Sequence, residues 1–210
     1  MAPDTPFLLA TRSAGKLREL GGIVTSAGFR AVNLSEARVA ETAEEEGIEC
    51  YNTFEENALA KARYFNALTG MPTLADDSGL CVDALGGAPG VWSKRFSDEK
   101  GLSGRALDDA NNVKLIDELA HATDLGAGYK CAAAFVGNGL EAVEMGEVRG
   151  RIVSEPRGED GFGYDPYFLS DELGLTFGEA GIDAKQEISH RGRAFRRLFE
   201  RHSDKIRNSL

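Results

Sequence analysis

Short apolar runs alternate with helical patterns in the first part of the chain, and this alternation restricts the fold more than any other feature. An apolar run at residues 7–10 precedes a segment, ending near residue 27, whose apolar residues recur at three- and four-residue steps. A second apolar run at 29–34 and a second helical pattern at 54–69 follow. Strands that alternate with helices are typical of an α/β protein.

The second half of the chain has a different pattern. Residues 129–136 and 141–148 predict a β-hairpin around Gly137-Asn138-Gly139, and residues 150–153 are expected to continue the sheet. Helices are predicted at residues 106–119, with Ser103 as a capping residue, and at residues 189–201. Early alternation followed by a hairpin indicates an α/β protein with a mixed sheet. The chain shows neither a repeat nor a linker, so we expect one domain over residues 1–210.

Composition excludes several kinds of partner. Lys and Arg number 24 against 34 Asp and Glu, so the net charge is −10. An acidic chain disfavours a nucleic-acid polymer or an anionic membrane as ligand, because both require a basic face. The apolar runs are too short to span a bilayer. The three cysteines include no C-x-x-C pair, so we expect no zinc site, no disulfide framework and a cytoplasmic location.

The first candidate site follows the first predicted strand, at residues 11–16. Free N–H groups at a helix start favour an anion, and Lys16 adds a positive charge while Thr11 and Ser13 add hydroxyl groups. The segment lacks the first glycine and the Lys-Ser/Thr pair of a Walker A motif. A phosphate site and an ordinary capped loop both agree with this pattern.

The second candidate is the pair Asp76 and Asp77, at the end of the apolar run 73–75. Carboxylates beside buried residues are costly unless they meet water, a cation or donors. On an extended chain the two side chains point to opposite sides, so one can reach a cleft while the other braces a turn before the next apolar run, 80–82. Oxygen ligands of this kind suit Mg²⁺. The alternative is a turn with two solvated acids.

The third and fourth candidates are a loop and a cluster in the C-terminal part. In Gly161-Phe162-Gly163-Tyr164-Asp165-Pro166, aromatic rings could stack on a planar base and Asp165 could contact its edge. A turn that buries both aromatic residues is an equal alternative. Lys185 and Ser189-His190-Arg191 bring several donors together near a helix start, although a single histidine on a helix is usually structural.

Six segments in this order resemble the inosine triphosphate pyrophosphatase family, the dITP/XTP pyrophosphatases. The resemblance extends from residue 11 to residue 192. The segments are Thr11-x-x-x-x-Lys16, Glu56-Asn57-Ala58 with Lys61-Ala62, Ala75-Asp76-Asp77-Ser78-Gly79-Leu80, Gly86-Gly87-Ala88-Pro89-Gly90-Val91, Gly161 to Pro166, and Ile188-Ser189-His190-Arg191-Gly192.

The resemblance implies a fold and an activity. The expected fold is α/β, with two lobes around a long mixed β-sheet, flanking helices and an active-site cleft between the lobes. The expected activity is Mg²⁺-dependent hydrolysis of ITP, dITP and XTP to the monophosphate and pyrophosphate. Members are usually homodimers.

The resemblance also assigns roles to residues. Asp77 matches the general base and metal ligand, and Glu45 matches the second metal carboxylate, with Glu44 and Glu46 left open as neighbours. The substrate-binding positions are Thr11, Arg12, Ser13, Ala14, Gly15 and Lys16 for the triphosphate, Ser78, the loop residues Phe162, Gly163, Tyr164 and Asp165, and Lys185, His190 and Arg191 around the purine.

Two departures and two alternative functions remain. This chain has Ser13 where the family usually has Asn, and its segment 49–53 is longer than in the shortest members. A nucleotide-binding regulator without turnover would retain the phosphate and base loops but would not require the metal carboxylates. A triphosphate hydrolase for modified pyrimidines is the other alternative.

Overall fold

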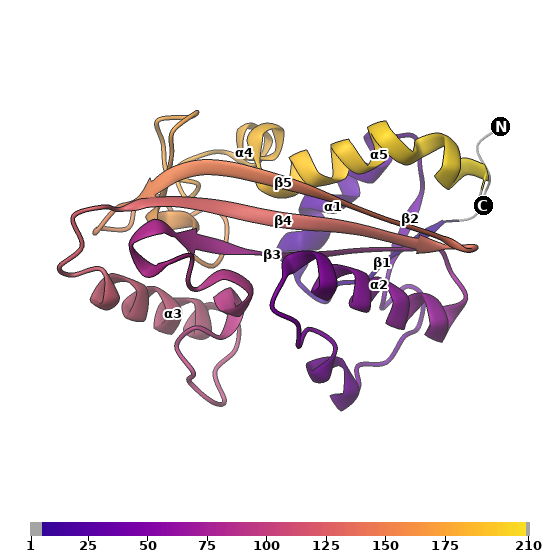
Figure 1. The fold of residues 1–210 in the computed structure, drawn as a ribbon, viewed down its shortest axis with the longest axis horizontal. Coiled ribbons are helices and arrows are strands. Elements are labelled where there is room, and N and C mark those ends of the chain that lie inside the picture. The colour runs from indigo at the N-terminus through magenta and orange to yellow at the C-terminus, as the bar shows by residue number, and fades with distance from the viewer. Residues whose placement is uncertain (1–5, 209–210) are drawn as a thin grey trace. The chain divides into compact units, whose positions relative to one another are not determined.

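The computed structural model describes residues 6–208, without the side chains of Ile182, Asp183 and Asn208, so the ends of the expected domain, 1–5 and 209–210, lie outside it. Helices and strands alternate as far as β3, and a long hairpin follows (Figure 1). The elements in chain order are β1 Phe7–Leu9, α1 Ala14–Ser26, β2 Ala31–Asn33, α2 Phe54–Thr69, β3 Thr73–Val82, α3 Gly104–Glu118, β4 Gly126–Gly137, β5 Leu140–Ile152, β6 Phe168–Ser170, α4 Ile182–Ile188 and α5 His190–Asn208. Short 3-10 helices lie at Ala43–Gly47, Asp83–Leu85, Gly90–Arg95 and Asp165–Tyr167.

The strands form one six-stranded sheet in the order β2-β1-β3-β4-β5-β6. Strand β1 is parallel to β2, where Leu8 is opposite Val32, and parallel to β3, where Leu9 is opposite Leu74. Strand β6 is antiparallel to β5. The sheet is therefore mixed and carries flanking helices, which confirms the predicted α/β class.

The chain divides into two compact units. Unit 1 contains Met1–Asp77, Cys131–Gly146 and Arg191–Leu210, and unit 2 contains Ser78–Lys130 and Glu147–His190. Strands β3, β4 and β5 each contribute residues to both units. The expectation of one domain over the whole chain stays a prediction.

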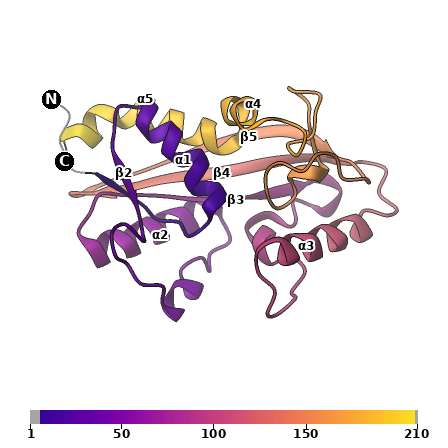
Figure 2. The ribbon, with the colours of Figure 1, turned by 180° about the vertical axis from the view of Figure 1, so that it is seen from behind.

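In unit 1, apolar side chains of α1 and α5 pack on one face of the strands, and α2 lies on the other face (Figures 1 and 2). Phe7 of β1 contacts Phe29 and Phe135, with ring centroids 4.7 and 5.6 Å apart. Leu20 of α1 and Leu198 of α5 are buried in the same cluster. This core holds the C-terminal end of β1, where α1 begins.

Unit 2 has its own apolar cluster. Tyr129 of β4 contacts Phe168 and Phe177, with ring centroids 4.8 and 5.8 Å apart. Leu115 of α3 and Leu80 of β3 are buried in this cluster. Helix α3 thereby lies against the unit 2 strands, with its polar residues near the loop at 161–165.

Three predictions about the elements differ from the structure. The expected turn at residues 76–79 is absent, because β3 runs unbroken from Thr73 to Val82. Two helices, α4 and α5, occupy the C-terminal region instead of one, and β6 was not foreseen. Ser103 stands at the N-cap of α3, but its side chain makes no capping hydrogen bond. Among the described residues, no helix has the length and apolar character needed to cross a membrane.

Candidate active site

The segment at residues 11–16 connects β1 to α1 and is shaped by its own hydroxyl groups. Ser13 is the N-cap residue of α1, and its Oγ accepts a hydrogen bond from the backbone N–H of Lys16 at 3.4 Å. The backbone N–H of Ser13 donates to Thr11 Oγ1 at 3.2 Å. Ala14 and Gly15 form the first turn of α1, which contains no acidic residue. No carboxylate of this turn therefore neutralises the partial positive charge at the N-terminus of α1, and this charge favours an anion.

Asp76 is a fully buried anion surrounded by cations. Its Oδ2 lies 3.0 Å from Lys16 Nζ and 3.0 Å from Arg191 Nε. Burial alone would raise the pKa of Asp76, but the charges of Lys16, Arg191 and Lys61 outweigh it and hold that pKa well below its usual range. Asp76 is thus a permanent anion that anchors Lys16 beside the start of α1.

Asp77, the next residue on β3, has the opposite electrostatic character. Burial and the nearby Glu49 raise the pKa of Asp77 to about 6, against the opposing effects of Lys16 and Lys61. Asn57 Nδ2 donates to Asp77 Oδ2 at 3.0 Å. A carboxylate with a pKa near neutrality is suited to accept a proton.

Glu49 and Lys61 belong to the same group of charges. Lys61 Nζ forms a hydrogen-bonded ion pair with Glu49. Burial opposes ionisation of Glu49, but Lys61 and Lys16 together lower its pKa. The site in unit 1 therefore contains two neighbouring carboxylates, Asp77 and Glu49, with two lysines beside them.

Glu45, the expected second metal carboxylate, lies against Arg12 instead. Arg12 Nη2 donates to Glu45 Oε1 at 2.6 Å, and Arg12 Nε donates to Oε2 at 3.0 Å. Arg12 also donates to the carbonyl oxygen of Val39 at 3.1 Å. Both oxygens of Glu45 bond this arginine, whereas Glu49 lies near Asp77, so Glu49 is a further candidate for the second carboxylate.

In unit 2, the loop predicted to bind a base is organised around Asp165. Asp165 Oδ2 accepts hydrogen bonds from Lys185 Nζ at 2.7 Å and from the backbone N–H of Phe162 at 2.8 Å. Lys185 Nζ lies 5.0 Å from the centroid of the Phe162 ring, which is only partly buried. The structure thus brings Phe162, Asp165 and Lys185 together, as expected.

Two other residues of this region have packing roles. Tyr164 is buried in the core, and its hydroxyl donates to the carbonyl oxygen of Ser93 at 2.8 Å. His190 is 4% exposed and stacks on Tyr129 with ring centroids 4.7 Å apart. Ser78 is the first residue of unit 2 and is partly exposed.

Arg191, the third residue expected around the purine, is held by carboxylates. It belongs to unit 1, where its guanidinium is buried between Asp76 and Glu19 and forms ion pairs with both. Burial would lower the pKa of Arg191, but the two carboxylates raise it well above its usual value. In the structure Arg191 therefore supports Asp76, and its expected place around the purine stays a prediction.

Sequence reasoning gave no role to Asn57, Lys61, Glu49 or Glu19, although all four contact the charged residues of unit 1. For two of them, the spacing in the sequence could have indicated that they lie together. Asn57 and Lys61 are four residues apart on α2, which places them on the same face of the helix. Glu49 and Glu19 carried no comparable signal, because only the tertiary structure brings them to their partners.

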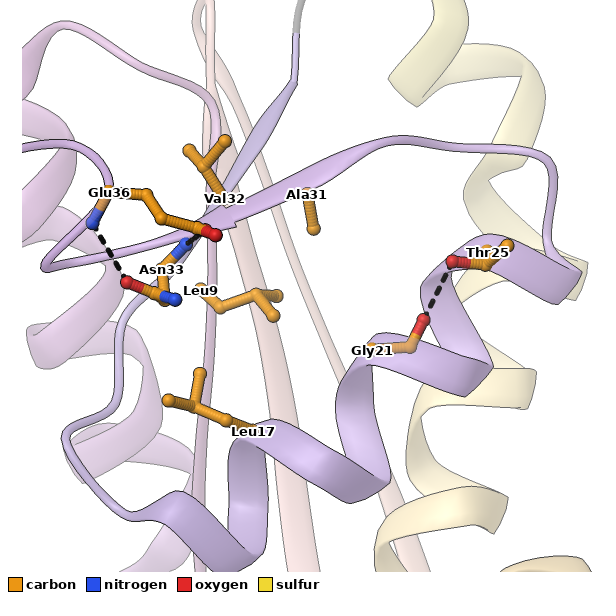
Figure 3. Close-up of a pocket in the computed structure, with 8 residues that line it drawn as sticks. All are labelled: Leu9, Leu17, Gly21, Thr25, Ala31, Val32, Asn33 and Glu36. Carbon is orange, nitrogen blue, oxygen red and sulfur yellow. Dashed lines mark hydrogen bonds between the residues drawn. The ribbon is translucent and has the colours of Figure 1, made fainter.

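A pocket in unit 1 is lined by none of the charged residues described above (Figure 3). Its walls come from α1, β2 and Leu9, and its polar groups bond one another: Thr25 Oγ1 donates to the carbonyl oxygen of Gly21, and the backbone N–H of Glu36 donates to Asn33 Oδ1. Neither Asp76 nor Asp77 lines it, so it is not the candidate site.

Comparison with known proteins agrees with these observations. The chain is 44% identical to a dITP/XTP pyrophosphatase of Geobacter sulfurreducens over 193 residues, covering 90% of this chain and 92% of that protein. It is 41% identical to a dITP/XTP pyrophosphatase of Nitrosomonas europaea, covering 94% of each chain. Among solved structures, a HAM1 protein from Coxiella burnetii matches with a TM-score of 0.81 and 33% identity, covering 95% of this chain and 99% of that one. The model of the Ham1 family matches residues 7–201. With nearly its whole length matched, the chain belongs to the Ham1 family.

Proposed function

We propose that this chain hydrolyses non-standard purine nucleoside triphosphates, such as dITP, ITP and XTP, to the monophosphate and pyrophosphate. The observation that carries the proposal is the group of Asp77, Glu49, Lys16 and Lys61 next to the start of α1. It combines a carboxylate suited to accept a proton with positive charges suited to a triphosphate. The names of the similar proteins from Geobacter and Nitrosomonas support this substrate class.

We propose Mg²⁺ as the cofactor. Among the described residues, no group of three or more His, Cys, Asp and Glu side chains could hold a metal ion. Mg²⁺ commonly uses only one or two protein carboxylates and completes its shell with water and substrate phosphates, so the pair Asp77 and Glu49 fits it. Burial and the repulsion from Glu49 both raise the pKa of Asp77, and a bound cation would relieve that repulsion. Bound there, Mg²⁺ would neutralise phosphate charge.

Different residues of unit 1 act on the attacking water and on the leaving pyrophosphate. Asp77 accepts the proton of the water that attacks the α-phosphorus, and Asn57 orients the carboxylate through its hydrogen bond. Lys16, held by Asp76, and the N–H groups at the start of α1 stabilise the pyrophosphate that leaves. Lys61 adds a second positive charge to the same group.

The residues of unit 2 would recognise the base. The ring of Phe162 offers a surface for stacking, and Lys185 offers N–H donors to the six-oxo edge of hypoxanthine or xanthine. Adenine has an amino group at that edge, so a donor would meet a donor. Because unpaired buried donors are costly, adenine is rejected.

A panel of nucleoside triphosphates tests the proposed function. ITP, dITP, XTP, GTP, ATP and a methylated UTP are assayed for pyrophosphate release, with and without Mg²⁺. We expect release from ITP, dITP and XTP, and only with the metal. Binding of ITP without turnover would favour a regulator, and preference for the methylated UTP would favour a pyrimidine hydrolase; either result would refute the proposal.

We further propose that the protein is a cytoplasmic homodimer, with no nucleic-acid polymer or membrane as partner. The dimer follows from the family resemblance, and the location from three scattered cysteines without a disulfide pattern. Light scattering tests the dimer, because one chain has a mass of 22.6 kDa. A monomer at working concentrations would contradict it.

A further inference from the structure

Helix α3 holds both backbone groups of one residue in the loop at 161–165. Asp108 Oδ2 accepts a hydrogen bond from the backbone N–H of Gly163 at 3.0 Å. Asn112 Nδ2 donates to the carbonyl oxygen of Gly163 at 3.0 Å. Asp108 and Asn112 are four residues apart, so they lie on the same face of the helix. We call these two residues the α3 clamp.

The residue held by the α3 clamp is one of the two glycines in the loop. Gly163 has φ +63°, a left-handed conformation that glycine adopts without steric cost. Glycine also loses the most conformational entropy when it is fixed. Its N–H belongs to the peptide shared with Phe162, and its carbonyl to the peptide shared with Tyr164. The clamp therefore fixes both peptide planes that flank Gly163, and with them the direction of Phe162.

The clamp also has a cost in stability. Asn112 is only 6% exposed, and its Oδ1 has no hydrogen-bond partner among the described residues. A buried amide oxygen without a partner is unfavourable. An apolar side chain of similar shape would avoid this cost but could not bond Gly163. Residues that break a local rule of stability are concentrated at functional sites.

We infer that Asp108 and Asn112 are positioning residues for base recognition. The inference rests on the proposed function, because it assigns the loop at 161–165 to the purine. The clamp acts through Gly163 on the ring of Phe162, whose neighbour Lys185 is held separately by Asp165. Base recognition then depends on α3, although the clamp residues themselves need not touch the base.

Matched substitutions in α3 test the inference. Asp108→Ala removes the acceptor for Gly163, whereas Asp108→Asn retains an oxygen that can accept the same bond. Asp109→Ala is the control, because Asp109 is exposed on the same helix. We expect Asp108→Ala to raise KM for ITP about tenfold with kcat changed by less than about threefold. Asp108→Asn and Asp109→Ala should remain within about twofold of the wild type.

Inhibition by inorganic tripolyphosphate separates positioning of the base from general damage. This inhibitor has no base, so its Ki should be the same in the wild type and in Asp108→Ala. An equal rise in KM for ITP and in Ki for tripolyphosphate would overturn the inference, as would an unchanged KM for ITP. If Asp108→Ala does not fold, Asn112→Leu replaces it, because it removes the donor to Gly163 together with the unpaired buried Oδ1.

Failure of the inference and failure of the proposed function give different results. If the wild type releases no pyrophosphate from ITP, dITP or XTP, the proposed function fails. If the wild type is active and both Asp108→Ala and Asn112→Leu keep its KM for ITP, the proposed function stands and the role of the clamp is refuted.

Discussion

Asp76 and Asp77 are adjacent residues of one strand with opposite pKa shifts. Successive side chains of a strand point to opposite faces, so each aspartate has its own surroundings. Asp76 meets Lys16 and Arg191, which keep it ionised, while Asp77 meets Asn57 and the repelling charge of Glu49. The strand thus separates one carboxylate that holds Lys16 from the one that we propose as the base.

Replacement of Asp77 tests its role as the base. We expect Asp77→Asn to lower kcat by about 10²–10⁴-fold, because the amide cannot accept the proton of the attacking water. The shape is conserved and Asn57 retains an acceptor, so the thermal midpoint should change little. Pyrophosphate release and thermal unfolding are measured together. Near-normal turnover in a folded variant would refute the role of Asp77.

The choice between Glu49 and Glu45 is testable with matched substitutions. We expect Glu49→Gln to raise the Mg²⁺ concentration for half-maximal activity by roughly tenfold or more, because one of two carboxylates is lost. Glu45→Gln removes a carboxylate that bonds Arg12 and should change that concentration by less than about twofold. A larger effect of Glu45→Gln would restore the original assignment.

Lys185 is expected to contribute to binding rather than to turnover. Its ammonium group lies beside the Phe162 ring and donates a hydrogen bond to Asp165. Both partners belong to the loop that we assign to the base. Lys185→Ala should raise KM for ITP by about tenfold or more with a smaller change in kcat. The exposed Lys205→Ala serves as the control. An unchanged KM in Lys185→Ala would contradict this role.

At the scale of elements, α2 shows how local signals set the limits of a helix. Thr53 caps its start by accepting a hydrogen bond from the backbone N–H of Glu56 at 3.2 Å. Gly70 ends it in a left-handed conformation, with φ +68°. These residues are typical of helix ends, which explains why the predicted range 54–69 coincides with the observed one.

Two glycine substitutions should have opposite effects on stability. Gly70→Ala places a side chain at positive φ and should lower the free energy of unfolding by about 1 kcal/mol. Gly21→Ala lies inside α1 with no atom near the added carbon, so it should raise that free energy by about 0.5–1 kcal/mol. Urea denaturation measures both. If both substitutions changed the free energy of unfolding equally, backbone conformation would not explain their effects on stability.

At the scale of the whole molecule, three strands belong to both units. A strand cannot lose its hydrogen bonds in one half without disturbing the other half, so we expect one cooperative unfolding transition. Trp92 is the single tryptophan, and it lies in unit 2. Its fluorescence and the far-ultraviolet circular dichroism of the whole chain should have the same urea midpoint. Separate midpoints would show that the units unfold independently.

The early alternation and the hairpin were predictable because they depend on local patterns. Apolar periodicity and helix caps predicted α1, α2 and the β4–β5 hairpin, and the motifs predicted the family. The unbroken β3 was not predictable in the same way. By local pattern, Asp76 and Asp77 are typical of a turn. Their carboxylates can lie in a buried strand because Lys16, Arg191 and Asn57, which are distant in sequence, form ion pairs and a hydrogen bond with them.

The amino-acid sequence by itself determined the fold class, the family and part of the candidate site, because periodicity and motif order are properties of neighbouring residues. Only the tertiary structure decided which charges meet. It paired Glu45 with Arg12, placed Glu49 beside Lys61 and Asp77, and buried Arg191 between Asp76 and Glu19. Electrostatic effects depend on distance and burial, which sequence spacing does not contain.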